Sequence, residues 1–550
     1  MRIGIIFDGS TLKRWQYDAI RQVAHGNEFY LMIAHGERAP KRKLPKHAAY
    51  YALNVLAMRS RQTRRVPFPA NDIPVAGELE FTVDYDGAWA SLPQSALDFA
   101  IAHRLDAILK FSLNLLRIPT AEALPVPILS YHHGDPRHYR GRPAGFYETA
   151  DGVQHVGQIV QVLCNTLDAG EILAAGHTPV LPWSYKQTLA AAYRLSPRLL
   201  PQALDALRTR QSIDWSPEGR NYRLPSNLSV VRFGLRQARA ALTRGLYGAF
   251  VEKRWQVSFL DRPGQDLTAL ATDPTALEAA RSDWRTFEVP KGYMFLADPF
   301  FARDGTVMAE ALSASSGTGH LVSLDPDDPS SDRAVRLYDT AGGHLSYPST
   351  FAWEGREWLL PETAHWARPH ICALEDRKIA ERLDLDIDVE RMLDPTMLEH
   401  DGTWYLFGNL AEEGPEVLRL WHGESPADRF EEHPQSPIRA SIRGSRMGGA
   451  LIETADGLVR IGQDRRAAYG DGLCLFAVTR ISPSRYEERE IARLAFERVS
   501  GPHTLNLHGD RLLFDWYADR VSPLAGVRRV SARLRSRRAE TAADQASAAS

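Results

Sequence analysis

Acid–base residues gather directly after one apolar run of the sequence. Residues 126–131 are predicted to form a strand, and the segment from His132 to Gly141 adds imidazoles, a carboxylate and two guanidinium groups beyond its carboxyl end. Downstream, Asp168 stands in a Leu-Asp-Ala-Gly turn before a further apolar run. One imidazole oriented by one distant carboxylate is suited to proton transfer. The sequence therefore predicts a proton-transfer site that pairs one of these histidines with a distant aspartate.

Two other interpretations of the same cluster stay open. The histidine-rich loop could cap the sheet without any chemistry. It could also bind a metal ion, and its candidate ligands are His132, His133, Asp135 and His138. Adjacent histidines seldom both face one ion, and these residues follow no regular ligand spacing. The sequence therefore favours proton transfer and predicts no metal site.

Strands and helices alternate through the first third of the chain. Apolar runs predict strands at residues 2–7, 28–34, 106–111 and 126–131, and helical spacing predicts helices at 12–23 and 95–103. This βαβ order gives a mostly parallel sheet with ligand sites at the carboxyl ends of its strands. We expect a Rossmann-type α/β domain over residues 1–185.

Two segments near this domain are unusually basic. Residues 38–65 contain the run Lys41-Arg42-Lys43 and are predicted to form a solvated insertion, with a patch for an anionic substrate or a membrane surface as the alternative. Residues 186–250 are helical and basic, and we predict a connector between domains. Its arginines would mark a solvated face, and they are Arg232, Arg236, Arg239 and Arg244.

Residues 1–185 resemble the formyltransferase family, which includes methionyl-tRNA, glycinamide ribonucleotide and sugar N-formyltransferases. That family has a strand ending in Asn-x-His, a loop finishing in Tyr-Arg-Gly and a Leu-Asp-x-Gly turn, and His132, Tyr139-Arg140-Gly141 and Asp168 match these motifs. Ser130 stands at the family's asparagine position, and its hydroxyl is a shorter donor than an amide. Losing one donor to a developing oxyanion typically costs about 2.7–4 kcal/mol of transition-state stabilisation.

The resemblance implies transfer of a formyl group from 10-formyltetrahydrofolate to an amine. Ser130, His132 and Asp168 would be the catalytic residues. Other polar side chains of the loop would contact substrate, and these are His133, Asp135, Tyr139 and Arg140.

Strand–turn–strand segments repeat in the second half of the chain. Three of them begin at Asp298-Pro299, Tyr347-Pro348 and Asp394-Pro395, with the prolines 49 and 47 residues apart. Weaker copies begin at Ser445 and His503. A period near 50 residues with two strands in each copy is typical of a β-propeller blade. The five copies predict an all-β five-bladed propeller over residues 251–525.

Carboxylates at equivalent places in this repeat are candidates for glycoside chemistry. Asp298 and Asp394 would converge at the mouth of a small propeller, and glycoside hydrolysis needs two carboxyl groups. The pattern resembles the five-bladed arabinanase and xylosidase-type glycoside hydrolases, in which Asp298 would match the base and Asp394 the aspartate that tunes the acid. No glutamate starts the fourth repeat, which reads Ser445-Arg446-Met447. The alternative is that both aspartates cap turns.

A more extensive resemblance covers residues 255–520. They resemble the amino-terminal region of plant glucosamine inositolphosphorylceramide transferases and their bacterial relatives, with matching stretches at residues 297–300, 344–348, 462–464, 469–472 and 503–506. Glycosyl transfer in the plant proteins is attributed to a separate carboxyl-terminal domain, so the resemblance implies a setting in glycan or glycolipid assembly. A polar turn in the fourth repeat is a candidate sugar or phosphate contact, and it carries Asp464, Arg465 and Asp471.

Composition narrows the class of protein. The 550 residues include 66 basic and 68 acidic side chains, a net charge of −2 that gives no global attraction to nucleic acid. Three widely spaced cysteines indicate neither a disulfide framework nor a zinc ribbon. The sequence shows neither a secretory signal pattern nor an apolar stretch of membrane-spanning length, so we expect a cytoplasmic protein.

The last residues differ from the rest in composition. Residues 526–550 are basic and then rich in Ala and Ser, which predicts a disordered tail. Val527, Val530 and Leu534 could instead form an apolar stripe on a basic helix, through which such basic segments could make peripheral contact with a membrane.

These observations favour a transferase of glycoconjugate or polysaccharide biosynthesis. The first domain would formylate an amino sugar, the propeller would bind the glycan, and the partner would be a carbohydrate or glycolipid. A tRNA substrate is disfavoured because the second half of the chain predicts a propeller in place of a small basic barrel. The alternatives are a propeller-based glycosidase or transglycosidase, and a non-catalytic glycan-binding protein with two degenerate sites.

Overall fold

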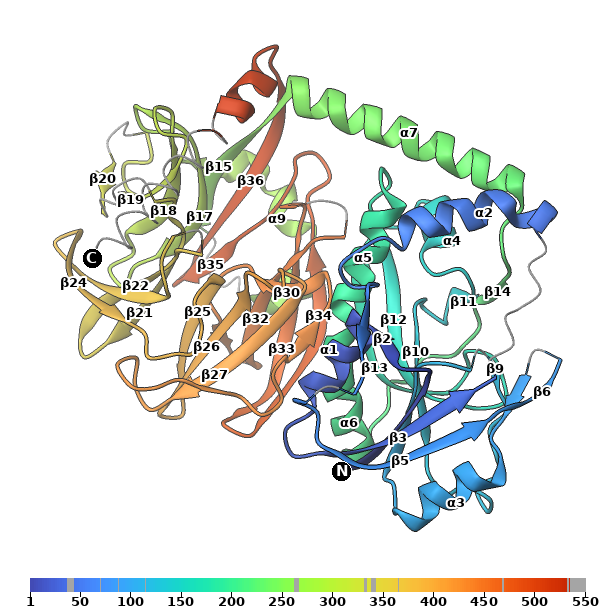
Figure 1. Ribbon diagram of the computed structural model, residues 1–550. Helices are drawn as coiled ribbons and strands as arrows, with labels where there is room; N and C mark the ends of the chain where they lie inside the picture. Colours follow the sequence, from blue (N-terminus) through green and yellow to red (C-terminus); the bar gives the residue numbers. More distant parts are fainter. Residues whose placement is uncertain are drawn as a thin grey trace. The chain divides into compact units, whose positions relative to one another are not determined.

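The computed structural model (Figure 1) describes residues 1–534 except 37–43, 70, 88, 114, 262–266, 331–333, 338–342, 365, 467–468 and 532–533. The chain divides into two compact units, Met1–Leu242 (unit 1) and Thr243–Ser550 (unit 2). The predicted fold class, an α/β domain followed by a five-bladed propeller, is confirmed by the sheets of these two units.

Unit 1 is built on a seven-stranded sheet of order β13-β12-β10-β8-β1-β3-β5. The five strands from β5 to β10 run parallel, and β12 and β13 are antiparallel additions beyond β10. These strands are β1 (Arg2–Asp8), β3 (Glu28–His35), β5 (Val75–Thr82), β8 (Ala107–Lys110), β10 (Ile128–His132), β12 (His155–Val162) and β13 (Glu171–Pro179).

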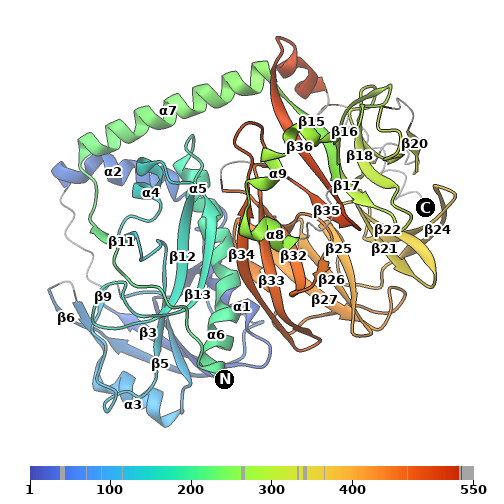
Figure 2. The same cartoon turned by 180° about the vertical axis from the view of Figure 1, so that it is seen from behind.

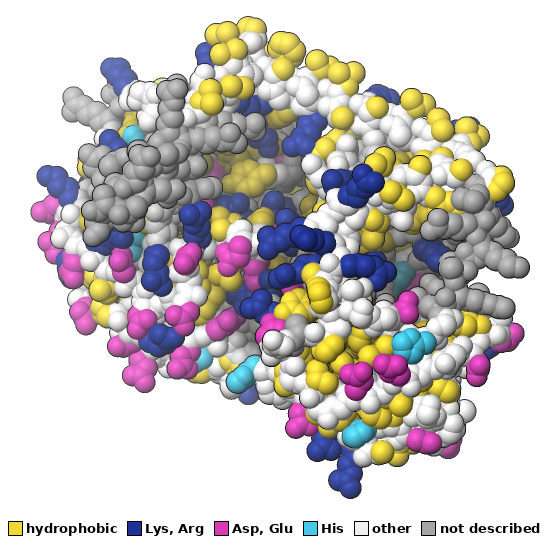
Figure 3. Space-filling model, in the orientation of Figure 1, with side chains coloured by type: hydrophobic (Ala, Val, Ile, Leu, Met, Phe, Trp, Pro, Cys, Tyr) yellow, Lys and Arg dark blue, Asp and Glu magenta, His cyan; other side chains and the backbone are white. Residues whose placement is uncertain are grey.

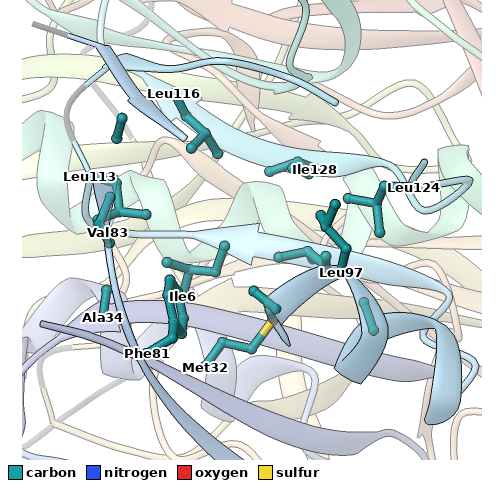
Figure 4. Packing of buried hydrophobic residues seen from close by; sticks show 14 of the residues in the cluster. Ile6, Met32, Ala34, Phe81, Val83, Leu97, Leu113, Leu116, Leu124 and Ile128 are labelled. Carbon is teal, nitrogen blue, oxygen red and sulfur yellow. The ribbon is translucent and has the colours of Figure 1, made fainter. Parts of the chain in front are cut away.

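Continuous apolar runs explain the central strands of this sheet. The interior residues of β1 are all buried, as expected for a parallel strand covered on both faces. Figure 4 shows Ile6, Met32 and Ile128, from neighbouring strands, packed with Leu97 of α3 (Gln94–Ala102). The sheet is therefore a rigid base that fixes the carboxyl end of β10.

Helices cover this sheet and extend unit 1 beyond residue 185. Helices α5 and α6 run beside β12 and β13 (Figures 1 and 2) and bury Leu189 and Leu204. Because these apolar faces pack into unit 1, residues 186–242 are part of that unit and do not form a separate connector. The other helices and short strands are α1 (Arg14–Gln22), α2 (Leu44–Ala57), α4 (Phe146–Asp151), α5 (Tyr185–Leu195), α6 (Leu199–Thr209), α7 (Asn227–Phe250), β2 (Thr11–Lys13), β4 (Arg65–Pro67), β6 (Asp84–Asp86), β7 (Trp89–Ser91), β9 (Leu115–Leu116), β11 (Tyr139–Gly141) and β14 (Arg220–Tyr222).

The basic insertion is only partly the solvated segment that was predicted. Lys41-Arg42-Lys43 lie outside the described residues. Helix α2 buries Tyr50 and Ala57 in an aromatic cluster with Phe146 and Tyr185. This part of the insertion is therefore attached to the core of unit 1.

Unit 2 contains five antiparallel sheets, one for each predicted blade. The last sheet pairs β15 with β36 along its whole length, so strands from both ends of the unit close the ring. Short helices α8 (Leu267–Thr272) and α9 (Ala276–Ala279) follow β15. The blades are β17 (Tyr293–Phe301), β18 (Val307–Ser313), β19 (Gly319–Leu324) and β20 (Val335–Arg336); β21 (Ser346–Trp353), β22 (Arg356–Glu362), β23 (His370–Glu375) and β24 (Lys378–Asp384); β25 (Met392–His400), β26 (Thr403–Leu410), β27 (Val417–Gly423), β28 (Glu431–Glu432) and β29 (Arg439–Ala440); β30 (Arg443–Met447), β31 (Ile452–Thr454), β32 (Gly457–Asp464), β33 (Leu473–Ser482) and β34 (Arg485–Leu494); and β35 (Leu505–His508), β36 (Arg511–Val521), β15 (Val251–Asp261) and β16 (Arg285–Thr286).

The prediction of a disordered tail from residue 526 is wrong for its first residues. Residues 525–531 are helical. Arg528 lies 3.1 Å from both carboxylate oxygens of Glu252, and Arg529 donates to the carbonyl oxygens of Gly248 and Val251. These bonds attach the helix to unit 2. Residues 535–550 lie outside the described part of the chain.

Candidate functional site

The predicted pair of unit 1 is in contact. His132 ends β10, Asp168 lies in the turn before β13, and the Nδ1 atom of His132 is 3.2 Å from Oδ1 of Asp168. Both side chains are largely buried, with 9% and 13% of their surfaces exposed. The Nε2 atom of His132 lies 3.3 Å from the carbonyl oxygen of Tyr139. Each ring nitrogen therefore faces an oxygen acceptor.

The loop between β10 and α4 clamps the turn that carries Asp168. Asp168 has a left-handed backbone with φ of 49°, a conformation that non-glycine residues hold only when neighbours impose it. The backbone N–H of Gly141 donates to Asp168 Oδ2 at 2.7 Å, and Arg140 donates to the carbonyl oxygen of Leu167 at 2.5 and 3.1 Å. The Tyr-Arg-Gly loop thus positions the carboxylate against His132.

Gly141 should be irreplaceable in this clamp. Its φ is 84°, and a Cβ atom there would lie 2.3 Å from the carbonyl oxygen of Tyr222. Gly141→Ala is expected to destabilise unit 1 by more than the about 1–2 kcal/mol of left-handed strain alone. Gly152→Ala is the matched control because its φ is 77° and no atom lies within 4 Å of the added carbon. Equal thermal unfolding temperatures for the two variants would contradict the clamp.

Ser130 lies two residues before His132 and so on the same face of β10. It is buried, and its hydroxyl donates a long hydrogen bond of 3.5 Å to the carbonyl oxygen of Tyr131. Lys110, the last residue of β8, is its neighbour in the register of the sheet. The role of Ser130 as an oxyanion donor stays a prediction.

The other predicted residues of this loop have protein partners. His133 Nε2 lies 2.9 Å from the hydroxyl of Ser196, and burial lowers the pKa of His133 to about 3, which keeps the ring neutral. Asp135 is buried and accepts two hydrogen bonds from the Arg137 guanidinium, which hold its pKa below the usual range although burial alone would raise it. The guanidinium group of Arg140 donates its hydrogen bonds to backbone carbonyl oxygens. We interpret these contacts as interactions that hold the loop between β10 and α4 in place.

A small pocket adjoins the Tyr139–Gly141 strand that holds Asp168, and neither His132 nor Asp168 lines it. It is bounded by Tyr139, Gly141 and Arg142, with Tyr222 and the buried Glu148 on its other sides. Burial raises the pKa of Glu148 to about 8, so this carboxyl can hold a proton near neutral pH. Sequence reasoning missed Glu148 because a single glutamate in a short helix carries no motif.

Unit 2 gathers a second set of charged residues on its inner strands. Strands β17, β21 and β25 contact one another in sequence. Each has a bulge at which a non-glycine residue is left-handed: Asp298 with φ of 49°, Tyr347 with 46° and Asp394 with 43°. Such strain is concentrated at functional positions. The two predicted aspartates thus occupy equivalent places in the fold.

Asp298 belongs to a buried network with a charged histidine. His503 Nδ1 lies 3.1 Å from Asp298 Oδ1 and 3.3 Å from Asp515 Oδ2, and Thr504 donates to Asp298 at 3.2 Å. Burial alone would lower the pKa of His503, but the two carboxylates raise it to about 10. The imidazolium therefore compensates two aspartates that are both almost fully buried.

The charge on His503 predicts a pH-dependent stability. Because its folded pKa of about 10 lies above its ordinary value of 6.5, its contribution is complete below pH 6.5 and is lost as the pH rises toward 10. The free energy of unfolding should fall with pH, by at most about 1.4 kcal/mol per unit. His503→Gln should remove this slope, measured by denaturant unfolding across the range. The exposed His508 supplies the control His508→Gln, and a slope that survives in His503→Gln would refute the assignment.

Asp394 is held by a buried arginine from the fourth blade. Arg446 donates to both carboxylate oxygens of Asp394 and lies 3.3 Å from Glu362 Oε2. Gln463 donates to Asp394 at 2.8 Å. Although burial raises the pKa of Asp394, Arg446 brings it below its usual range. The pKa of the buried Glu362 is raised well above its usual range, by burial and by the Asp394 charge.

Glu310 adds a buried carboxyl group with a raised pKa near Asp298. It lies in β18 opposite Ala297, and burial together with the charge of Asp298 raises its pKa well above the usual range. A protonated carboxylic acid beside an ionised carboxylate is the combination that glycoside chemistry uses. In the sequence, Glu310 stood out only as a residue that ends the second strand of the first repeat.

Aromatic rings border this charged set. Tyr469 is 40% exposed, with its ring centre 4.7 Å from that of His503 and 5.4 Å from the Arg446 guanidinium carbon. Trp255 packs against both His503 and Tyr469. Exposed aromatic faces beside polar groups suit the binding of a sugar ring. Sequence reasoning passed over Trp255, which lies in a blade far away along the chain.

The predicted polar turn of the fourth blade divides into different roles. Asp464 is fully buried between Arg466 and Arg493, so it is a structural ion pair. Arg465 lies 3.4 Å from Glu416, and its pKa is lowered by burial. Asp471 accepts a hydrogen bond from the hydroxyl of Tyr517. Their roles in substrate binding stay predictions.

Two groups of residues have the donor types of a metal site, and both also have charged partners. Asp135, His155 and His177 lie close together, as do Asp298, His503 and Asp515. Arg137 already neutralises Asp135, and the guanidinium carbon lies 3.8 Å from the Trp215 ring centre. The imidazolium of His503 does the same for the second group. We therefore interpret both groups as ion-pair networks.

Sequence comparison confirms the resemblance of the propeller. Residues 292–511 match the family model described as glucosamine inositolphosphorylceramide transferase 1, N-terminal. The protein of that name from Oryza sativa subsp. japonica is 26% identical over 204 residues, covering 35% of this chain and 27% of the relative. The Arabidopsis thaliana protein is 24% identical over 209 residues, covering 36% and 27%. The chain thus spans about a quarter of the length of these curated relatives.

Solved structures similar to this chain fall into two groups. Glycinamide ribonucleotide transformylase 1 from Symbiobacterium toebii is 17% identical, with a TM-score of 0.27, covering 39% of this chain and 92% of its own. The sugar 3N-formyl transferase WlaRD is 9% identical, with a TM-score of 0.24, covering 40% and 69%. The compost-metagenome β-xylosidase/α-arabinofuranosidase CoXyl43 is 12% identical, with a TM-score of 0.28, covering 37% and 78%. We infer nothing from scores this low.

Proposed function

We propose that this protein is a transferase of glycoconjugate biosynthesis in which unit 1 moves a formyl group from 10-formyltetrahydrofolate to the amine of a sugar and unit 2 binds the glycan. The observation that carries the proposal is the 3.2 Å contact between His132 and Asp168. The matches to the formyltransferase motifs support the reaction type. The match of residues 292–511 to a glycolipid transferase family supports the glycan setting.

The surroundings of His132 suit a general base. With its Nδ1 proton donated to Asp168, Nε2 is the atom that accepts a proton from the attacking amine. The carbonyl oxygen of Tyr139, 3.3 Å from Nε2, then accepts a hydrogen bond from the new N–H. Asp168 and Tyr139 together stabilise the imidazolium.

The bond changes of the transfer balance around this base. The amine nitrogen forms a bond to the formyl carbon, its proton passes to His132, and the bond from that carbon to the donor nitrogen breaks. Tetrahydrofolate leaves after its nitrogen regains a proton. Ser130 and Lys110, near the carboxyl ends of their strands, are the groups placed to stabilise the oxyanion.

Aromatic and basic side chains line the small pocket next to the Tyr139–Gly141 strand. The rings of Tyr139, Tyr222 and Tyr147 stack in series, with centres 5.6 and 4.2 Å apart. Arg142 lines the same pocket. Aromatic faces beside a guanidinium suit a heterocycle with carboxylates or phosphates, the chemistry shared by folates and nucleotide sugars.

The reaction is tested by mixing the full chain with 10-formyltetrahydrofolate and a panel of free and nucleotide-linked amino sugars. The release of tetrahydrofolate is followed by its absorbance, with the corresponding N-acetyl sugars as substrates that lack a nucleophilic amine. We expect turnover only with amines. Background rates across the whole panel would overturn the formyl-transfer proposal.

A propeller-based glycosidase or transglycosidase is the second candidate. The raised pKa of Glu310, near the Asp298 carboxylate, favours it, because one group could act as acid and the other as base. Asp298→Asn would then abolish the cleavage of aryl glycosides. A non-catalytic glycan-binding role predicts binding without cleavage in the same assay.

Both the glycosidase role and the glycan-binding role of the propeller predict that Tyr469 binds sugar. Tyr469→Ala should weaken glycan binding by up to about tenfold, the effect of losing one aromatic contact of about 0.5–1.5 kcal/mol. The measurement is titration of a glycan identified on an array. Tyr17→Ala in unit 1 is the control, and unchanged affinity in Tyr469→Ala would exclude stacking on this ring.

A further inference from the structure

Helix α7 carries an exposed apolar stripe along almost its whole length. The stripe starts at Leu228, and its other five residues follow 3, 7, 14, 18 and 22 positions later, which places all six on one side of the helix. All are between 47% and 67% exposed, and the set is Leu228, Val231, Leu235, Leu242, Leu246 and Phe250. Figure 3 shows hydrophobic side chains over the region where α7 runs in Figure 1. We call this set the α7 stripe.

A second apolar surface adjoins the end of α7 within unit 2. Leu524, Val527 and Val530 of the segment around helix 525–531 are each more than half exposed. This helix is joined to α7 because Arg529 donates to the carbonyl oxygen of Gly248 at 2.6 Å and Ser522 N–H donates to that of Phe250 at 2.7 Å. Helix 525–531 is therefore attached to the last turn of α7, the part of that helix that belongs to unit 2.

Arginines outnumber acidic side chains around these surfaces, where Glu252 pairs with Arg528 and Asp519 accepts a hydrogen bond from Tyr247. Residues 227–250 contain four arginines and no acidic residue, and residues 521–539 contain six arginines and no acidic residue. Arg239 occupies a position of the stripe itself, 11 residues after Leu228, and Arg232 adjoins it. The exposed apolar side chains of the stripe thus lie next to cationic groups along the same side of the helix.

This combination fits the surface of an anionic lipid bilayer. Among the described residues no helix is long and apolar enough to cross a membrane. A helix with one apolar side and basic flanks lies instead in the plane of the interface, with its apolar side chains among the acyl chains and its arginines at the lipid phosphates. At about 1.5 Å per residue a helix of 24 residues is long and straight, a shape that matches a flat surface better than a compact pocket.

We propose that α7 and helix 525–531 dock this protein onto membranes that contain anionic lipids. The proposal is independent of formyl transfer. It also revises the sequence-based view of 186–250, because the exposed face of α7 is apolar as well as basic.

The test is flotation of the full chain with vesicles of phosphatidylcholine alone or with about one third phosphatidylglycerol. We expect binding to the anionic vesicles that weakens as salt is raised. Leu235→Glu combined with Leu242→Glu should lower the bound fraction at least tenfold. Ile101→Glu is the matched control, because Ile101 is also exposed, at 48%, but lies on α3.

A second measurement reports the depth of the helix. An environment-sensitive fluorophore on Leu242→Cys, in a Cys164→Ser background, should shift to the blue on adding anionic vesicles, whereas the same probe on Ile101→Cys should not. Equal binding of wild type and the double variant would overturn the proposal. So would a lack of vesicle binding, including the case in which the stripe joins two copies of the chain into a dimer.

Discussion

His132→Ala is expected to lower the rate of formyl transfer by about a thousandfold with little change in KM for the sugar, the usual effect of removing a general base. The imidazole is the group that accepts the amine proton, and no other described side chain contacts both Asp168 and the carbonyl oxygen of Tyr139. Steady-state kinetics with saturating donor measure the effect.

Asp168→Asn tests the same pair from the other side. The asparagine amide has the same shape as the carboxylate, but its NH2 group donates a hydrogen bond. An NH2 group facing Nδ1 of His132 would favour the wrong tautomer of the imidazole, so kcat should fall by about a hundredfold or more. His138→Ala is the matched control, because His138 is an exposed histidine of the same loop. A large loss in His138→Ala would instead support the metal interpretation of the loop. Full activity in Asp168→Asn would contradict the pair.

Arg446→Ala is expected to destabilise unit 2 by about 3–5 kcal/mol, the range for removing one partner of a buried ion pair. Asp394 and Glu362 are 1% and 4% exposed, so their carboxyl groups would remain buried without their cation. Hydrogen exchange of peptides from β25 and β30 measures the loss of protection in unit 2 itself. The result therefore does not depend on whether unit 1 unfolds.

The controls separate this effect from simple loss of charge. Arg429 is paired with Asp386 and Asp388 but is more than half exposed, so Arg429→Ala should leave the exchange of unit 2 unchanged. In the double variant Arg446→Ala/Asp394→Ala part of the stability should return, because the uncompensated charge is also removed. A double variant less stable than Arg446→Ala alone would show that the ion pair does not determine the effect.

Much of unit 1 could be predicted from the sequence because its strands are continuous apolar runs. The strand expected at residues 2–7 is β1 at Arg2–Asp8, and the one expected at 28–34 is β3 at Glu28–His35. The contact between His132 and Asp168 was also predictable, since the two motifs that carry them occur in the order and spacing of the formyltransferase family. Apolar pattern and motif together were sufficient here.

The partners of the propeller aspartates could not be predicted in the same way. His503 precedes the strands of the last blade, so closure of the ring brings it to Asp298 of the first blade, and Arg446 reaches Asp394 from the next blade along the chain. The fourth repeat drew attention for its missing glutamate, whereas the structure shows that Arg446 compensates Asp394. Pairing across a closed ring leaves no local signal in the sequence.

Helix α7 was misjudged for a different reason. Arginines at helical spacing usually indicate a solvated face, and that rule directed attention to Arg232 and Arg239. No prediction was made for the leucines at the same spacing. The structure buries only Val230 and Phe233 of this helix, so most of its apolar side chains remain at the surface.

Label transfer measures the central claim most directly. The full chain is incubated with a donor carrying an isotopically labelled formyl carbon and the amino sugar that gives turnover, and the product is analysed by mass spectrometry. The account predicts a labelled N-formyl sugar from the wild type and almost none from His132→Ala. An absence of labelled product from the wild type, or equal amounts from both proteins, would contradict it.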